Sequence, residues 1–356
     1  MTGPYTVALE ARADVVAGRV GGKCAGLVAL AGAGCPVPPG FVVTVDAFEA
    51  LLADPVLRRG VESVIRGLDP TEPAWVEATE AGSAEIRRIL SGHPVPPEVA
   101  EAVIGAYGAL CEGLGAGDVP VAVRSSATAE DQPYASFAGQ HDTFLWVRGA
   151  EAVLDAVRLC WASLWSARAI GYRAANGVPE EGLAMAVGVQ QMVDARTGGA
   201  AMTVNPSNGD RTKIVIEAGW GLGEPVMSGM EPPDHYLVDK VLLVPVRTTV
   251  ARKSYELVPT PDGRGLVRRP LDVGRREAPC LGADEVIEVA RLAKEAERHC
   301  GLPQEIEWAI ARDAPAPNGL RLLQSRAETV WSRRPAPSTG VTGSGAAGIA
   351  DTLFGL

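Results

Sequence analysis

The sequence contains little of several features that would assign it to a common class. Histidine occurs four times and cysteine six times in 356 residues, and no two cysteines form a C-x-x-C pair. This scatter lacks the spacing of zinc ligands and is typical of reduced thiols in a cytosolic protein. The apolar run from Val15 to Val43 is interrupted by Arg19, Lys23, glycines and prolines. We therefore expect neither a membrane span nor a signal peptide, and a cytoplasmic location.

Basic residues are fewer than acidic residues: the chain has 33 Lys and Arg but 43 Asp and Glu. The formal net charge of −10 and a pI of about 5.1 exclude the basic surface that binding to a nucleic-acid backbone requires. Hydrophobic residues make up 47% of the chain and charged residues 21%, as in ordinary globular proteins, and the length allows two domains or lobes. Any nucleotide would therefore be bound by a local site.

The first candidate for such a site is Arg124. An apolar run from Val119 to Val123 has strand character and stops at this arginine, before small hydroxyl residues and two acids. A guanidinium group matches phosphate oxygens, and small neighbours let backbone N–H groups approach an anion. The pattern predicts a strand that delivers a polyphosphate-binding loop. An ion pair of Arg124 with Glu130 or Asp131 is the alternative.

The second candidate is Lys23, in the segment GGKCAGL that leads into an Ala/Leu/Val run ending at Gly34. This pattern predicts a glycine turn followed by a helix. A lysine at a helix N-terminus can contact a phosphate, and a solvent-facing lysine is the alternative. Helical spacing also extends over residues 47–116, 151–176 and 283–299.

Two later segments, EIEWAI and LRLLQSR, alternate polar and apolar residues around a turn rich in proline and glycine. A hairpin centred on this turn would place Glu307 opposite Gln324 and Glu305 opposite Arg326. Carboxylate and amide oxygens suit a nucleotide-bound Mg²⁺ ion. A shift of the register by one residue would move the whole set to the other face.

Several motifs together resemble one family. The strings AVRSSATAEDQPYASFAGQHDTF, GGKCAGL, GWGLGE with PDHYLV, EIEWAI and LLQSRAETVW are similar to the ATP-binding portion of phosphoenolpyruvate synthase, pyruvate phosphate dikinase and rifampicin phosphotransferase. The resemblance implies an α/β (α+β) fold of the ATP-grasp type, with ATP and Mg²⁺ between two lobes. The lobes are expected at residues 1–190 and 191–331, followed by a linker or docking tail at 332–356.

The resemblance also implies roles for individual residues. Catalytic contacts with the phosphates are implied for Lys23, Arg124 and Arg326, and metal binding for Glu307 and Gln324. The other implied nucleotide contacts are Gly139, Thr143, Gln190, Met192 and Val193, of which the last three would line the adenine. Two departures from the family pattern are Cys24, after the lysine, and Ala327, where relatives commonly have proline.

In the full-length dikinases a swivelling domain with a phosphorylated histidine follows the ATP-binding portion. The histidines of this chain, His93, His141, His235 and His299, lie outside any such motif. The resemblance implies an ATP-binding subunit, as in phenylphosphate synthase, that passes the β,γ-pyrophosphoryl group of ATP to a histidine-bearing partner protein and releases AMP. A small-molecule acceptor would be reached through that partner. The alternatives are a self-contained ATP-grasp ligase or kinase and a non-catalytic nucleotide sensor.

Overall fold

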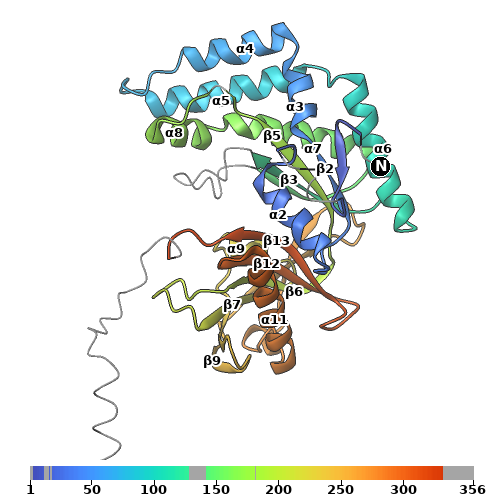
Figure 1. Ribbon diagram of the computed structural model, residues 1–356, viewed down its shortest axis with the longest axis vertical. Coiled ribbons are helices and arrows are strands. Elements are labelled where there is room, and N and C mark those ends of the chain that lie inside the picture. Colours follow the sequence, from blue (N-terminus) through green and yellow to red (C-terminus); the bar gives the residue numbers. More distant parts are fainter. Residues whose placement is uncertain (1–2, 12–15, 17, 128–141, 181, 332–356) are drawn as a thin grey trace, which may run out of the picture.

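The computed structural model describes residues 3–11, 16, 18–127, 142–180 and 182–331 (Figure 1). The predicted contact residue Gly139 and the predicted tail, 332–356, lie outside the described residues. The rest forms two lobes, each built on an antiparallel sheet and drawn one above the other in Figure 1.

The first lobe contains a five-stranded sheet in the order β1-β2-β5-β3-β4. Its strands are β1 (Thr6–Ala8), β2 (Gly40–Val43), β3 (Val121–Ala127), β4 (Thr143–Val147) and β5 (Met185–Gln191). The central strands β3 and β5 are buried on both faces, which explains their nearly continuous runs of apolar and small residues.

One face of this sheet is covered by helices. They are α3 (Val45–Leu52), α4 (Pro55–Arg66), α5 (Trp75–Gly92), α6 (Pro97–Gly113), α7 (Ala150–Ala162) and α8 (Ala167–Asn176). The single helix expected over 151–176 is wrong, because a 3-10 turn, Ser163–Trp165, separates α7 from α8. The Ser166 hydroxyl accepts a hydrogen bond from Ala169 N–H and so caps a new helix instead of continuing the old one.

The second lobe contains a six-stranded sheet in the order β13-β12-β6-β7-β8-β9. Its strands are β6 (Ala195–Met202), β7 (Lys213–Trp220), β8 (Asp234–Asp239), β9 (Pro245–Thr249), β12 (Gln304–Ala311) and β13 (Leu320–Ala327). Helix α11 (Ala283–Cys300) packs its apolar stripe on one face of this sheet and ends at Gly301, near the predicted stop.

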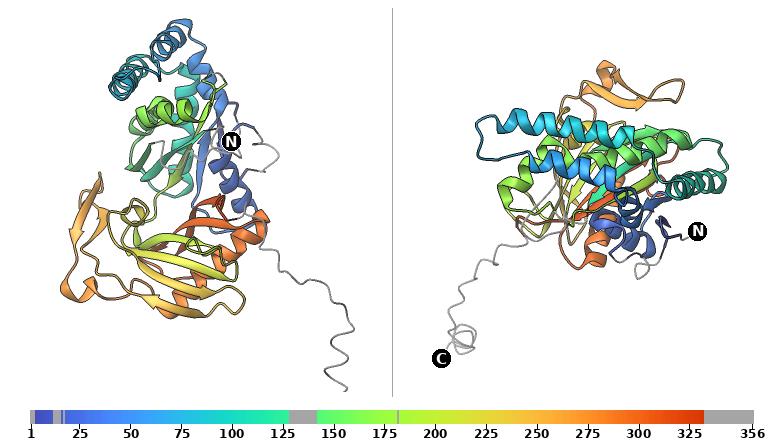
Figure 2. Two further views of the ribbon diagram at one scale, coloured as in Figure 1. Left: turned by 90° about the vertical axis from the view of Figure 1, so that its left-hand side faces the viewer. Right: turned by 90° about the horizontal axis from the view of Figure 1, so that it is seen from above.

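Three smaller elements complete the second lobe: α9 (Glu224–Met227), α10 (Val273–Arg276) and a hairpin of β10 (Tyr255–Pro259) and β11 (Leu266–Pro270). This hairpin stands apart from the large sheet and is drawn in orange in Figure 2.

A short linker connects the lobes, and helix α2 (Gly21–Gly32) packs against both of them. The chain passes from β5 to β6 through the linker Met192–Asp194, and the predicted boundary at residue 190 falls just before it. Helix α2 lies between the lobes: its buried residues Leu27 and Val28 share one hydrophobic core with Trp308 of β12. The exact limits of the lobes stay a prediction.

Candidate nucleotide site between the lobes

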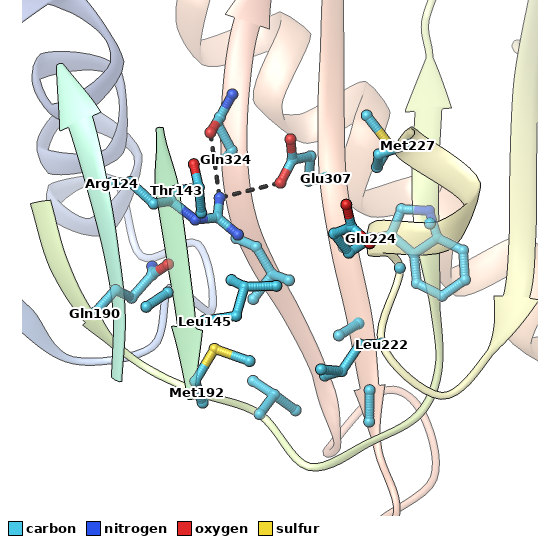
Figure 3. A pocket seen from close by; sticks show the side chains of 18 of the residues that line it. Arg124, Thr143, Leu145, Gln190, Met192, Leu222, Glu224, Met227, Glu307 and Gln324 are labelled. Atoms are coloured by element: carbon cyan, nitrogen blue, oxygen red, sulfur yellow. Dashed lines mark hydrogen bonds and ion pairs between the residues drawn. The ribbon is translucent and has the colours of Figure 1, made fainter. Parts of the chain in front are cut away.

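A cavity of about 300 Å³ lies between the two sheets (Figure 3). Its walls are formed by β3, β4 and the end of β5 from the first lobe, by the linker, and by β6, α9, β12 and β13 from the second. Clefts between domains and of this size are where small molecules are usually bound. The cavity has a polar end and an apolar end.

The polar end is formed by Arg124, Glu307 and Gln324. Arg124 NH1 donates to Glu307 Oε2 at 3.0 Å and to Gln324 Oε1 at 3.2 Å, which links the two lobes (Figure 3). Glu307 pairs with Gln324 across the β12–β13 hairpin, and Glu305 pairs with Arg326. The register predicted from the turn is therefore confirmed.

Arg124 lies within β3 and not in a loop after it, so the predicted end of the strand at Val123 is wrong. The strand continues because Ser125 and Ser126 pair with β5 and are buried. The ladder, and not a flexible loop, thus fixes the position of Arg124. Its Nε atom is buried and has no hydrogen-bond partner among the described residues, which leaves a donor for an anion.

Two protein oxygens at the polar end fit a magnesium ion. Glu307 Oε2 and Gln324 Oε1 both lie within 3.2 Å of one atom, the NH1 nitrogen of Arg124. Mg²⁺ prefers such hard oxygens and takes its remaining ligands from phosphates and water. No cluster of three or more His, Cys, Asp and Glu side chains that could hold a metal occurs in the part of the chain that is described. A metal here would depend on phosphate oxygens.

The apolar end fits a flat heteroaromatic ring. Leu145, Met192, Leu222 and Val193 line it, and Figure 3 shows the first three gathered on the side away from Glu307. Gln190 is buried beside them, and its Nε2 atom has no hydrogen-bond partner in the part of the chain that is described. Apolar walls with one unpaired amide donor are what a purine base with ring nitrogen acceptors requires.

The glycines of the GGK segment and of β6 have packing reasons. Gly21 has a φ of 61°, and a Cβ atom there would lie 2.1 Å from the Ser126 carbonyl oxygen. At Gly199, which lines the cavity, a Cβ atom would lie 2.0 Å from the Glu217 carbonyl oxygen of β7. Both positions exclude any side chain, because backbone approaches backbone too closely.

The structure brings together most of the predicted contact residues. Those that line the cavity are Arg124, Thr143, Gln190, Met192, Val193, Glu307 and Gln324. Lys23 and Arg326 are not among the lining residues. Their predicted phosphate contacts stay predictions.

Lys23 lies in the first turn of α2, which is attached to the end of β3. The backbone N–H of Cys24 donates to the Ser126 hydroxyl at 3.2 Å, and that hydroxyl donates to the Val20 carbonyl at 3.0 Å. The helix start is thereby held two residues beyond Arg124. This position brings Lys23 to the same end of β3 as the polar end of the cavity.

Arg326 is held beside the polar end by an acid on the neighbouring strand. Its NH2 group donates to Glu305 Oε1 at 2.7 Å. Burial acts against the charge of Arg326, but Glu305 and then Glu307 overcome this and raise the pKa of the guanidinium above its ordinary value. Arg326 is therefore a permanent cation near the carboxylates of Glu305 and Glu307.

Sequence reasoning missed several lining residues, among them Leu145, Leu222, Glu224 and Met227. Leu145 lies two positions from Thr143 on the same strand, so it shares the same face, and this spacing could have identified it. The other three lie in or just after GWGLGE, a segment from which no contact residue was predicted. Their place in the cavity depends on the packing of this loop against β6.

The described histidines lie away from the cavity. His93 Nε2 lies 3.5 Å from Asp54 Oδ2, and His299 Nε2 lies 3.8 Å from Glu295 Oε1. His235 lies on β8 opposite Glu217 of β7. His141 lies outside the described residues. Of the three described imidazoles, none lines the cavity, so none is placed to attack a nucleotide in it.

None of the cysteines in the described chain forms a disulfide bond, and most are buried. Burial raises the pKa of the Cys35 thiol to about 11, and it raises the pKa of the Cys160 and Cys280 thiols further. These thiols stay protonated near neutral pH and are poor nucleophiles.

Among the helices of the described residues, none is both long and apolar enough to cross a membrane.

Comparison with known proteins places this geometry in context. Residues 17–342 match the family described as the pyruvate phosphate dikinase AMP/ATP-binding domain. A probable phosphoenolpyruvate synthase of Methanothermobacter thermautotrophicus is 43% identical over 309 residues, covering 87% of this chain and 44% of the relative. The phosphoenolpyruvate synthase of Aeropyrum pernix is 40% identical over 340 residues, covering 88% of this chain and 41% of the relative.

A rifampicin phosphotransferase from a Streptomyces species is 37% identical over 329 residues, covering 92% of this chain and 36% of the relative. The chain thus spans less than half the length of each of these relatives. A solved L-amino acid ligase from Bacillus licheniformis aligns with 78% of this chain and 56% of its own, at 10% identity. Its TM-score of 0.22 is too low to support an argument.

Proposed function

The chain belongs to the family of pyruvate phosphate dikinase AMP/ATP-binding domains, and from this premise we propose that it is the ATP- and Mg²⁺-binding unit of a dikinase-type phosphotransferase. Membership confirms the predicted resemblance and the predicted ATP-grasp type of the mixed helix and sheet fold. In this proposal the unit passes the β,γ-pyrophosphoryl group of ATP to a histidine and releases AMP.

One observation carries the proposal: Arg124, Glu307 and Gln324 meet at one end of a cavity whose other end is apolar. The apolar end would receive adenine, with Gln190, Met192 and Val193 as its contacts. The triphosphate would then extend toward Arg124. A molecule with a flat base and a charged tail matches this division of the cavity better than a uniformly polar or apolar one.

The chain's own residues would hold the phosphates and balance their charge. Arg124 has an unpaired Nε–H donor and an NH1 group whose partners are the oxygens of Glu307 and Gln324. When a metal is bound at these oxygens, it neutralises charge on the phosphoryl oxygens. Arg124 would then turn its fork toward the phosphates, with Lys23 and Arg326 as further cations.

The nucleophile would be a neutral imidazole brought in from a partner protein. Its nitrogen would form a bond to the β-phosphorus while the bond from that phosphorus to the α,β-bridging oxygen breaks, and the electron pair would leave on AMP. The positions of His93, His235 and His299 outside the cavity support an external histidine. Water would then cleave the bond between the β- and γ-phosphates of the histidine-bound group and release the γ-phosphate. A small-molecule acceptor would receive the remaining phosphoryl group from that partner.

The test is to incubate the purified chain with Mg²⁺ and ATP labelled at the β-phosphate, with and without a histidine-bearing swivelling-domain protein. We expect AMP and acid-labile label on the partner only when both proteins are present. Rapid AMP formation with stable label on this chain alone would contradict the partner histidine. Release of ADP with transfer of the terminal phosphoryl group to a small acceptor would instead favour a self-contained kinase or ligase.

A further inference from the structure

The tip of the β10–β11 hairpin forms a second polar contact between the lobes. The carbonyl oxygen of Gly263 accepts hydrogen bonds from Trp146 Nε1 at 3.2 Å and from Arg148 NH1 at 3.0 Å. Arg148 NH2 also donates to the Asp118 carbonyl at 2.8 Å. Gly263 belongs to the second lobe, and the other three residues belong to the first. Figure 2 shows the orange hairpin standing out from its own lobe.

This contact lies on the linker side of the nucleotide cavity. Trp146 lines a neighbouring hollow of about 540 Å³ together with Gln191 and the linker residues Met192, Val193 and Asp194. The Arg124 contact with Glu307 and Gln324 joins the lobes at the polar end. The cavity is therefore bounded by one polar contact between the lobes at the polar end and by another near the linker.

The backbone at Trp146 is held in an uncommon conformation. Its φ angle is 62°, a region that bulky residues rarely adopt, and the β3–β4 register shifts nearby between Val121 and Val123. The Trp146 side chain is nevertheless buried and bonded to the hairpin tip. Conformations of this kind persist where surrounding contacts impose them, and they are frequent at ligand clamps.

The hairpin touches the wall of the cavity in both lobes. Near its base, the Leu257 carbonyl accepts the backbone N–H of Leu222 at 3.0 Å, and Leu222 lines the apolar end. The tip of the hairpin contacts Trp146 of β4, and Thr143 and Leu145 of the same strand line the opposite wall. The position of the hairpin thus relates one wall of the cavity to the other.

A buried carboxylate anchors the base of the hairpin. Glu256 on β10 is 1% exposed. Its carboxylate accepts hydrogen bonds from Arg275 NH1 at 2.8 Å, from Arg275 NH2 at 3.0 Å and from Arg269 Nε at 3.0 Å. Bidentate pairs of this kind are geometrically strict. Because the base is fixed to the second lobe, a movement of that lobe carries the tip with it.

We propose that the β10–β11 hairpin is a strap that holds the lobes closed over the nucleotide, with Trp146 and Arg148 as positioning residues for Thr143 and Leu145. The proposal rests on the proposed nucleotide site. When the lobes separate, the Gly263 contact breaks, and the β4 wall moves away from the wall at Leu222. The strap therefore acts on nucleotide release and does not touch the reacting atoms.

The first test removes the donors from the first lobe. The double variant Trp146→Phe, Arg148→Met keeps an aromatic ring and much of the side-chain volume, but neither new side chain has a donor for the Gly263 carbonyl. We expect release of a fluorescent ATP analogue, followed by stopped flow with Mg²⁺, to accelerate about tenfold, as expected for two lost hydrogen bonds. The matched control is Trp331→Phe, Arg158→Met, whose wild-type bonds to backbone carbonyls lie within single lobes.

The second test attacks the same contact from the second lobe. In Gly263→Ala, the added Cβ atom would lie 2.7 Å from Arg148 NH1, at a φ of 66°, so the contact must shift. The matched control is Gly115→Ala, which has a φ of 65° and no atom within 4 Å of the added Cβ. We expect faster release in the first variant and wild-type release in the second, each at a comparable melting temperature.

Amide hydrogen exchange on the nucleotide-free chain separates the strap from the nucleotide site. In both strap variants, we expect exchange to rise together in residues 143–147 and 261–265 and to stay unchanged in the controls. Wild-type release rates and unchanged exchange in folded strap variants would overturn the proposal. If the wild-type chain bound no nucleotide, the proposed function would fail, and the exchange result alone would still decide whether the hairpin holds the lobes together.

Discussion

Two ion pairs in different regions of the molecule differ in how far their side chains are exposed to solvent. Arg124 and Glu307 meet between the lobes, with 18% and 24% of their side chains exposed. Lys253 and Asp234 meet inside the second lobe, with 2% and 0% exposed. The first pair borders a cavity, and the second lies within packed side chains.

The two pairs also differ in how completely their hydrogen bonds are made. Asp234 accepts from Lys253, from Ala251 N–H at 2.9 Å and from Cys280 N–H at 2.7 Å. Arg124, in contrast, keeps a buried Nε–H without a partner. A fully satisfied buried network favours one conformation, whereas a partly satisfied cluster beside a cavity can exchange partners with a ligand. The comparison predicts stability effects at the Lys253–Asp234 network and activity effects at the cluster of Arg124, Glu307 and Gln324.

The largest expected effect is on stability, in Lys253→Met. Asp234 would remain buried without its cation, and breaking a buried pair in this way costs about 3–5 kcal/mol. Urea unfolding should report this loss. In the matched control Lys213→Met, the Lys213–Asp239 pair is 23% exposed on each side, and we expect a much smaller loss. Equal losses in the two variants would remove the distinction between buried and exposed pairs.

Next is the loss of turnover in Glu307→Ala and Gln324→Ala. Each variant removes an oxygen of the proposed metal site, and we expect AMP formation with the partner to fall at least about 100-fold. Stability should fall by less than about 1 kcal/mol, because Glu307 is partly exposed. The control is Asp313→Ala, in the turn of the same hairpin. Unchanged turnover in either variant would remove that residue from the site.

A smaller effect is expected at the apolar end. Met192→Ala removes part of the predicted adenine contact and should weaken ATP binding about tenfold, or about 1.4 kcal/mol. Turnover at saturating ATP should change little, because no charge is altered. Isothermal titration would measure the affinity, with Val241→Ala, at an exposed position outside the cavity lining, as the control. A loss of turnover without loss of affinity would contradict this division of roles.

The smallest expected effect concerns acid stability and the buried carboxylate of Glu256. Burial raises the pKa of this carboxyl, but Arg275 and Arg269 outweigh burial and lower the pKa below its ordinary value of 4.5. A lowered folded pKa stabilises the protein above the unfolded pKa, and this stability is lost as the pH falls through the folded pKa. Glu256→Gln should be less stable at pH 7 and should lose less stability between pH 5 and 3. Parallel unfolding curves for the two proteins would contradict this assignment.

Local patterns in the sequence predicted those parts of the site that depend on one turn or one strand. The turn between β12 and β13, with alternation on both sides, was sufficient to pair Glu307 with Gln324. The apolar run that ends at Val123 gave the wrong end for β3, because Ser125 and Ser126 look like loop residues and become strand only by pairing with β5. Ser166 likewise starts a new helix where spacing alone predicted a continuous one.

Contacts between distant parts of the chain could not be predicted from local patterns. Arg124 and Glu307 are 183 positions apart, and Trp146 and Gly263 are 117 positions apart. Their meeting depends on how the lobes pack, which composition and spacing do not encode. Glu224 and Met227 were missed for the same reason, because the fold of the glycine-rich loop against β6 brings them to the cavity.

The central claim is that ATP and Mg²⁺ share the polar end of the cavity with Arg124, Glu307 and Gln324. The most direct test is a crystal structure with a non-hydrolysable ATP analogue and Mn²⁺ in place of Mg²⁺, with the metal located by its anomalous signal. We predict a peak within about 2.5 Å of the Glu307 carboxylate and of Gln324 Oε1, with Arg124 turned toward the phosphates. A nucleotide bound elsewhere, or a metal peak that contacts neither Glu307 nor Gln324, would contradict the claim.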